Sequence, residues 1–438
     1  MSRNKDIRGA FSPPANLILY YDETNNIRKL TIRTEGNKSF LNNELHEFIL
    51  GGIAIERGAT PNYDKLLKQC VLLKTKDVKS KSFFKHDDFI KCIESKRVTF
   101  LLNWLVEENI LIHYFRQDNL YFALTGLMDS LLIHLEDDPY NTPGVVTEIK
   151  NGFYDFVMEN LPVFLSFFNK YSYPNVKRRN VGAFCVELLE IIHQYAKDSE
   201  SFSLGYIKNF LKHTIEGDLD LEGIHYGKGG TLSEDFEVAY LYRMTKTTSC
   251  THIFDWESNV IKFFKGMNVP YDYKFVHSED ERLIQLSDVV VKLISKYLEY
   301  VKSVNYKIPY DKMNKISIKN FKLLDLLIDR SNYKSTYLLE AMGPMRQVKN
   351  SYLALNHLFL LDEVLSLEEG TKSISDFEIM KEKNCHPFNN AQECFIMTIE
   401  DYYIAKTNGK ERLLYMLKDW DKDAQKHIMD IVITRMLD

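Results

Sequence analysis

The run LILYY at residues 17–21 constrains the fold most, because it is apolar on both faces and built from strand-forming residues. A strand without a polar face has to be covered on both sides, as central strands of α/β sheets are. The run ends in Asp22 and Glu23, which are followed by residues typical of turns. We therefore predict a central strand with acidic residues at its carboxyl end.

Two further strands are predicted close to the first one. Residues 28–33 alternate as in a half-exposed strand, and residues 46–55 form a strand that contains Gly51 and Gly52. We expect these strands to pair with residues 17–21 as a three-stranded antiparallel meander. Helical spacing then appears at 62–73 and 89–106, followed by a short strand at 110–115, which changes the pattern to mixed α/β.

A second set of strands follows a long helical stretch. The pattern predicts a strand at 250–254, a helix at 259–267, a strand at 273–276 and a helix at 279–300, with Ser278 as the cap of the last helix. Strand, helix, strand and helix in direct succession predict parallel pairing with right-handed crossovers.

The 438 residues exceed the size at which a single hydrophobic core usually stops growing. We expect a flexible N-terminus, two parts of one α/β core separated by a mainly helical insertion, and a helical C-terminal domain. The clearest C-terminal helices are predicted at 316–328, 352–367 and 391–404. The corresponding segments are 1–15, 16–119, 120–246, 247–302 and 303–438.

Composition excludes several classes of protein. Hydrophobic residues make up 45% and charged residues 27%, which is ordinary for a globular protein. The net charge of -5 is uninformative about nucleic acid, because phosphate binding depends on a local basic patch. Six cysteines without a CxxC pair argue against a zinc knuckle or a disulfide framework. Without an apolar leader or an apolar stretch of about 20 residues, we expect a cytoplasmic protein with no membrane partner.

Three aspartates stand where a sheet could gather them. Asp22 and Asp255 each follow a predicted strand, and alternation places Glu257 on the same side as Asp255. Asp288 lies at the edge of the apolar face of its helix, although Asp is seldom buried without a partner. Such carboxylates suit a hard cation, Mg²⁺ or Mn²⁺, because these ions take oxygen ligands.

Each aspartate alone also has a simpler interpretation. Asp22 could be a solvated turn residue, Asp255 could cap the following helix, and Asp288 could pair with a lysine of a neighbouring element. The order of all three favours a metal site, because two-metal phosphodiester hydrolysis needs three or four acidic ligands from separate elements.

The segments around these acids resemble the bacterial family catalogued as domain of unknown function 3800. The similar segments are YYDETN at 20–25, the strand with the glycine pair, IFDWE at 253–257, FVHS at 275–278 and IQLSD at 284–288. That family shows an Asp-Glu-Ser-Gly opening, an acid after a later strand, and a Gln-Leu-Ala-Asp helix near the end. The resemblance covers residues 15–300 without the insertion.

The resemblance implies an RNase H-like α/β fold, a mixed sheet flanked by helices, and a divalent-metal-dependent nuclease active in phage defence or in a mobile element. By position it makes Asp22, Glu23, Asp255 and Asp288 the catalytic acids. Asp22, Asp255 and Asp288 would bind the metal, and we add Glu257 as a further ligand. The implied partner is DNA or RNA, with a homo-oligomer or a defence-system protein as open alternatives.

The sequence departs from the family pattern at three positions. Thr24 and Asn25 replace Ser and Gly, which are mild changes, because Asn keeps access to positive φ. Phe83 stands where a Glu-x-Lys pattern leads us to expect an acid. Asp87 or Asp88 would then have to substitute, although both also suit the cap of a helix beginning at residue 89.

The stretch around Phe83 also carries lysines. We assign Lys81 and Lys85, interleaved with Phe83 and Phe84, to substrate binding, because aromatic and basic residues together bind nucleic-acid strands. The alternative is a solvated loop anchored by two buried aromatics. Because of Phe83, the alternative function is a catalytically weakened RNase H-like protein that binds nucleic acid or acts as a scaffold in a defence assembly.

Overall fold

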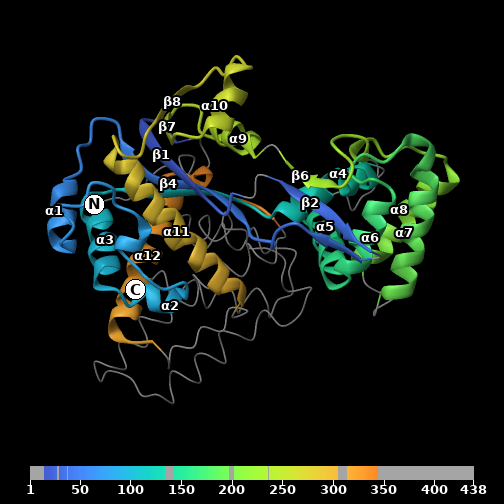
Figure 1. The fold of residues 1–438 in the computed structure, drawn as a ribbon, viewed down its shortest axis with the longest axis horizontal. Coiled ribbons are helices and arrows are strands. Elements are labelled where there is room, and N and C mark those ends of the chain that lie inside the picture. Colours follow the sequence, from blue (N-terminus) through green and yellow to red (C-terminus); the bar gives the residue numbers. More distant parts are fainter. Residues whose placement is uncertain are drawn as a thin grey trace, which may run out of the picture.

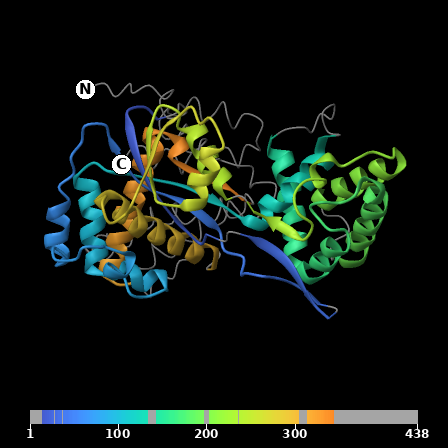
Figure 2. The same ribbon diagram turned by 45° about the horizontal axis from the view of Figure 1, so that its top comes forward.

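The computed structural model describes residues 14–26, 29–36, 38–133, 143–196, 202–234, 236–303 and 313–343. Within these ranges the chain forms two lobes side by side, each with its own hydrophobic core (Figure 1). The lobes remain distinct when the molecule is turned (Figure 2). The helices expected at 352–367 and 391–404 lie outside the described residues, as do residues 1–13.

The first lobe is built on a mixed six-stranded sheet in the order β8-β7-β1-β4-β5-β9. The strands are β1 (Leu17–Thr24), β4 (Phe48–Glu56), β5 (Leu111–Gln117), β7 (Thr251–Asp255), β8 (Asp272–Val276) and β9 (Leu339–Met342). β4 is antiparallel to β1 and β5, whereas β7 is parallel to β1 and β8, and β9 is parallel to β5. The mixed α/β fold and the parallel pairing of β7 and β8 are therefore confirmed.

Helices cover this sheet and complete the first core. They are α1 (Tyr63–Cys70), α2 (Phe89–Ile93), α3 (Lys96–Glu107), α9 (Glu237–Lys246), α10 (Ser258–Lys265), α11 (Arg282–Ser303) and α12 (Lys315–Lys334), with single 3-10 turns η2 (Ser80–Ser82) and η7 (Thr336–Leu338). The single helix expected at 89–106 is wrong. The chain turns between α2 and α3, where the Ser95 hydroxyl donates to the Phe83 carbonyl at 2.7 Å.

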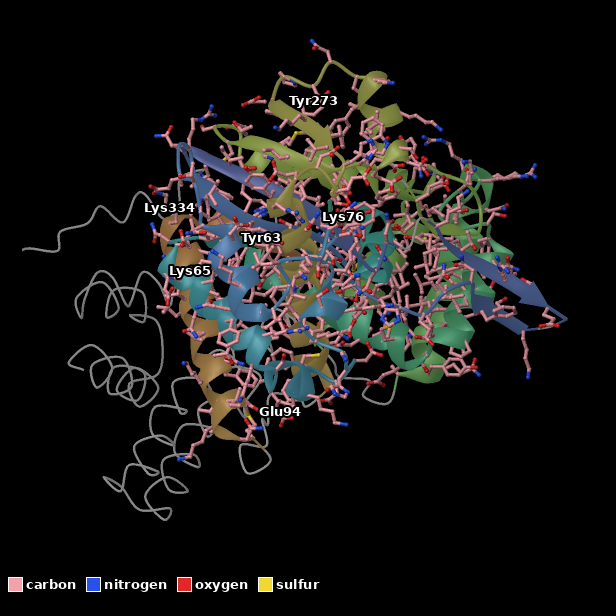
Figure 3. The ribbon with its side chains drawn as sticks, turned by 60° about the vertical axis from the view of Figure 1, so that its left-hand side comes forward. Tyr63, Lys65, Lys76, Glu94, Tyr273 and Lys334 are labelled. Atoms are coloured by element: carbon pink, nitrogen blue, oxygen red, sulfur yellow. The ribbon has the colours of Figure 1, made fainter. Side chains whose placement is uncertain are left out.

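Surface ion pairs tie the outer helices to this lobe. Lys65 on α1 and Lys334 on α12 lie on the same side of it (Figure 3). Lys65 pairs with Glu107 of α3 at 2.7 Å, and Lys334 pairs with Glu56 of β4 at 3.0 Å. Exposed pairs of this kind contribute at most about 1 kcal/mol each, so the buried core stabilises the lobe.

The second lobe is mainly helical. Its helices are α4 (Asn119–Leu132), α5 (Pro143–Glu159), α6 (Leu161–Lys170), α7 (Val181–Tyr195) and α8 (Phe202–Glu216), with turns η4 (Arg178–Asn180) and η5 (Glu222–Ile224). A small sheet in the order β3-β2-β6 joins them, formed by β2 (Leu30–Glu35), β3 (Lys38–Leu41) and β6 (Thr231–Ser233). The predicted meander is therefore wrong. The alternating pattern of β2 predicted a half-exposed strand but not the strands that it pairs with, which are β3 and β6 of this second sheet.

The first core includes elements that were expected in the insertion and in the C-terminal domain. Side chains of α9, including Tyr240 and Met244, belong to the first core, although residues up to 246 were expected in the insertion. Side chains of α12 and β9, including Phe321 and Leu339, also pack in the first core rather than in a separate C-terminal domain. In the part of the chain that the structure describes, no helix is long and apolar enough to cross a membrane.

α11 packs unusually close to the sheet at Gly52. A Cβ atom at this position, where φ is +154°, would lie 2.3 Å from the Tyr20 carbonyl oxygen and 2.4 Å from Ser287 Oγ. The Ser287 hydroxyl donates to the Tyr20 carbonyl at 3.0 Å. Glycine in β4 and a small residue in α11 therefore set the depth at which the next residue, Asp288, meets β1.

Candidate functional site

The end of β1 presents two acids to opposite faces of the sheet. The Tyr240 hydroxyl of α9 donates to Glu23 Oε2 at 3.0 Å, which places Glu23 on the α9 face. Because successive side chains of a strand alternate, Asp22 points to the other face, which α11 covers. β1 continues through Thr24, so Asp22 is part of the strand and not of a solvated turn.

Asp255 lies beside Asp22 on the neighbouring strand. The parallel register pairs Tyr21 with Phe254, so the next step along both strands brings Asp22 next to Asp255. Adjacent strands lie about 4.8 Å apart, and paired residues share a face. The Trp256 backbone N–H donates to Asp255 Oδ1 at 2.8 Å.

The capping interpretation of Asp255 is wrong. Glu257 caps α10 by accepting the Asn259 N–H at 3.1 Å. The strand ends at Asp255, so strand alternation no longer applies to Glu257, and its charge acts on Glu23 on the α9 face.

Asp288 reaches the same region from α11. This helix begins at Arg282, one turn later than expected, and Asp288 is only 6% exposed. Its Oδ2 accepts the Ser80 N–H at 2.9 Å, and its Oδ1 pairs with Lys292 at 3.1 Å. The lysine partner is therefore present, but it comes from the same helix.

The pKa values of Asp22, Glu23 and Asp255 are all raised, chiefly by burial. Burial raises the pKa of Asp22 well above its usual range, and the charges of Glu23, Asp288 and Asp255 raise it further. Burial also raises the pKa of Glu23 and of Asp255. The register of β7 beside β1 and the packing of α11 on β1 bring acids from these three elements to one region of the sheet. We call Asp22, Glu23, Asp255, Glu257 and Asp288 the acidic cluster.

Lys79 is a second cation close to the acidic cluster, besides Lys292. Its charge lowers the pKa of Asp255, and the charges of Asp288 and Asp22 help to raise its own. Its Nζ also pairs with Asp77 at 3.4 Å, so the acid-x-lysine pattern sought at residues 83–85 occurs at 77–79. That pattern was the signal in the sequence that could have identified Lys79.

The stretch chosen for substrate binding is placed differently. Phe83 and Phe84 are 2% and 6% exposed and belong to the first core, as in the alternative of a loop anchored by aromatics. Lys81 and Lys85 are exposed and do not appear among the charges that shift the acidic cluster. The basic side chains at the site are therefore Lys79 and Lys292 rather than Lys81 and Lys85.

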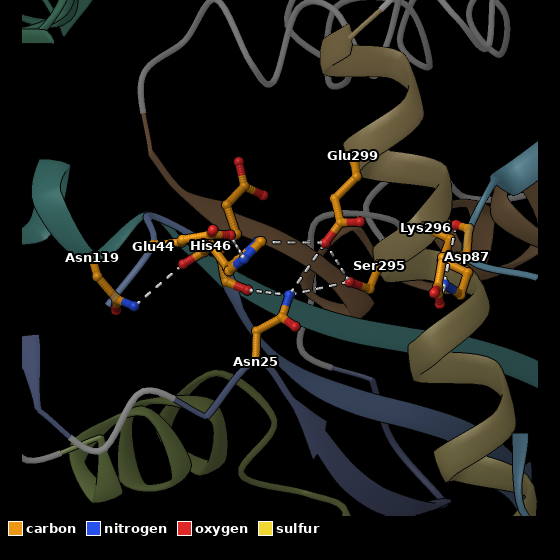
Figure 4. A network of polar contacts seen from close by, with 9 residues as sticks. Asn25, Glu44, His46, Asp87, Asn119, Ser295, Lys296 and Glu299 are labelled. Atoms are coloured by element: carbon orange, nitrogen blue, oxygen red, sulfur yellow. Dashed lines mark hydrogen bonds and ion pairs between the residues drawn. The ribbon is translucent and has the colours of Figure 1, made fainter. Parts of the chain in front are cut away.

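Asp87 and Asp88 do not replace the expected acid at residue 83. Asp88 caps α2 by accepting the Lys91 N–H at 2.9 Å, which confirms the capping interpretation. Asp87 pairs with Lys296 at 3.0 Å on the outer side of α11 (Figure 4). Both carboxylates are exposed and serve local structure.

Asn25 fastens the end of β1 to α11. It adopts φ +56°, the conformation expected from Asn in place of Gly. Its side-chain amide donates to the Glu47 carbonyl at 3.1 Å and to Ser295 Oγ at 3.2 Å (Figure 4). The position of Asp22 relative to α11 is thus fixed on both sides, by Ser287 and by Asn25.

The donor chemistry of the acidic cluster fits a hard cation. All five side chains offer oxygen, and the negative charges of Glu23, Asp288 and Asp255 around a partly buried Asp22 are the condition that a cation relieves. Among the described residues, no three His, Cys, Asp or Glu side chains are gathered so that they could hold one ion as they stand. Asp255 and Asp288 instead accept backbone N–H groups, and Asp288 pairs with Lys292.

Comparison with known proteins found no family model, no curated protein and no solved structure that matches this chain.

Proposed function

We propose that the protein is a divalent-metal-dependent nuclease that hydrolyses phosphodiester bonds of nucleic acid at the acidic cluster. One observation carries the proposal. Asp22 is partly buried at the end of β1, with Asp255 beside it in the register of β7 and Asp288 on the helix that covers the same face, and the charges of these acids and of Glu23 raise its pKa. Buried like charges are unfavourable without a compensating cation, and such clusters are a mark of functional sites.

Asp22, Asp255 and Asp288 would hold Mg²⁺ or Mn²⁺. A bound pair of ions would supply a nucleophilic hydroxide and stabilise the leaving oxygen. Tyr240 holds Glu23 in place from the α9 side, and Lys79 offers a positive charge to a phosphate. Lys292 neutralises Asp288 in the absence of an ion and would release it to the metal.

The strand arrangement supports an RNase H-like core as part of this proposal. The first five strands of this sheet along the chain are β1, β4, β5, β7 and β8. Across the sheet they lie in the order β5, β4, β1, β7 and β8, which is the third, second, first, fourth and fifth strand along the chain. The first three pair antiparallel with one another and the last two are parallel to the first, which makes a mixed sheet flanked by helices, as the resemblance implies. The acids then lie at the ends of the first and fourth strands and on the helix that follows the fifth.

A cleavage assay tests the proposal. Single-stranded and duplex DNA and RNA would be incubated with the full chain and Mn²⁺, with Asp22→Asn and Asp288→Asn as site variants. Asp87→Asn is the matched control, because Asp87 is an exposed aspartate paired with Lys296 on the same helix as Asp288. We expect the site variants to lose at least about 100-fold in rate and the control to keep it. Metal-dependent cleavage that survives both site variants would show the assignment to be wrong.

One observation favours the second candidate, a protein that binds nucleic acid or serves as a scaffold in a defence assembly without cutting. Asp288 is already satisfied by Lys292 and the Ser80 N–H, as in a site that works without metal. The two candidates differ in Mn²⁺ binding. The second predicts that nucleic acid binds equally well with Mn²⁺ or with a chelator, and that no strand is cut.

A further inference from the structure

Trp256 and His277 form an exposed stacked pair of aromatic rings. Their ring centroids lie 4.5 Å apart, with an angle of 18° between the planes. Trp256 is 51% exposed, whereas the other tryptophan in the described residues, Trp104, is 1% exposed. A large indole that stays in solvent contributes little to a core, so this pair calls for another explanation.

The pair stands directly beside the acidic cluster. The parallel register pairs Asp255 with Val276, so the chain places Trp256 and His277 at the next position of both strands, at the same edge of the sheet. The Asp255 carboxylate accepts the backbone N–H groups of Trp256 and Ser278. One acid of the cluster therefore holds the two backbone segments that carry the rings.

The charges around the pair suit a nucleic-acid strand. Lys79 directly precedes Ser80, whose backbone N–H donates to Asp288 at 2.9 Å, so a positively charged side chain lies beside the acidic cluster. A phosphate held near Lys79 and the acidic cluster would leave the adjoining base within reach of an exposed ring. Aromatic side chains bind bases through their faces with little dependence on sequence.

We propose that Trp256 and His277 form a platform on which an unpaired nucleobase stacks next to the phosphodiester at the acidic cluster. This inference rests on the proposed function and deepens it, because it makes single-stranded nucleic acid the substrate class. Bases in a duplex already stack on their neighbours and cannot offer a free face without unpairing.

Quenching of tryptophan fluorescence and fluorescence anisotropy test the platform on the full chain. The probes are a single-stranded oligonucleotide, the same strand with abasic sites, and the same strand annealed to its complement. Ca²⁺ replaces Mn²⁺, so that the strand is not cut during the titration. The variants are Trp256→Ala, His277→Ala and Trp256→Phe, with Tyr226→Ala as the matched control, because Tyr226 is an aromatic side chain that is 67% exposed on the second lobe.

We expect wild type to prefer the base-bearing single strand to the abasic strand and to the duplex. Trp256→Ala and His277→Ala should each weaken its binding by about 5-fold to about 150-fold, the loss typical of a base-stacking residue. Trp256→Phe should keep most of the affinity, and Tyr226→Ala should keep all of it. Melting curves of each variant confirm that the chain is folded.

Equal binding of the base-bearing and abasic strands by wild type would overturn the platform, as would unchanged binding by Trp256→Ala. If the platform is overturned but wild type cuts the strand and Asp22→Asn does not, the proposed nuclease function is still supported. Conversely, base-dependent binding through Trp256 in a protein that never cuts would support the platform and contradict the nuclease.

Discussion

The substitution Gly52→Ala probes the close packing that brings Asp288 to Asp22. The new Cβ would lie 2.3 Å from the Tyr20 carbonyl oxygen and 2.4 Å from Ser287 Oγ, whereas ordinary contact begins at 3.4 Å. α11 therefore has to move away from the sheet by about 1 Å to relieve the contact with Ser287, the Tyr20 carbonyl has to shift as well, and overpacking of this kind costs about 1–3 kcal/mol. Asp288 follows Ser287 in the chain and would move with it.

We expect Gly52→Ala to lower the free energy of unfolding in urea by about 2 kcal/mol and to weaken Mn²⁺ binding in calorimetry. Gly205→Ala is the matched control, because a Cβ at Gly205 in α8 would meet nothing within 4 Å. In a helix this change should stabilise by up to about 1 kcal/mol. Equal stability and equal Mn²⁺ affinity of wild type and Gly52→Ala would refute the packing argument.

Three further predictions concern the carboxylates. Because the folded pKa values of Asp22, Glu23 and Asp255 are raised, the stability due to these groups is fully present below their unfolded pKa and is lost as the pH rises through the folded values. Urea unfolding in a chelator should therefore show a smaller loss with rising pH in Asp22→Asn than in wild type; an identical pH profile would contradict the raised pKa of Asp22. Lys292→Met should cost about 1 kcal/mol, since Lys292 is 41% exposed, and should strengthen Mn²⁺ binding, because the competing cation of Asp288 is gone; weaker binding would argue against that competition. Tyr240→Phe removes the hydroxyl that donates to Glu23 and should cost about 2 kcal/mol in urea unfolding; no loss of stability would show that this hydrogen bond does not hold Glu23.

The sequence placed Asp22 and Asp255 at the ends of two strands, whereas the pairing of those two strands is a finding of the structure. An apolar strand buried on both faces has to lie inside the sheet, and a strand-helix-strand unit has to pair in parallel. Once β7 is parallel to β1, the acids that end both strands meet at one edge. The capping role of Asp88 could also be predicted from the sequence, because this residue stands directly before an apolar helix.

Other features depend on tertiary packing that a local pattern does not encode. β2 alternates like any half-exposed strand, and its partners β3 and β6 follow from how the second lobe folds. The close approach at Gly52 depends on Ser287, far away in the chain. Lys79 was one of several lysines in a loop, distinguished in the sequence only by the acid-x-lysine pattern at 77–79. The position of η2 against Asp288 brings it, rather than Lys81 or Lys85, to the acidic cluster.

Calorimetric titration with Mn²⁺ tests the central claim, that the acidic cluster is a divalent-cation site, most directly. We predict saturable binding to wild type, binding at least about 10-fold weaker in Asp22→Asn, and unchanged binding in Asp87→Asn. Absence of binding to wild type, or equal binding to wild type and Asp22→Asn, would contradict the account.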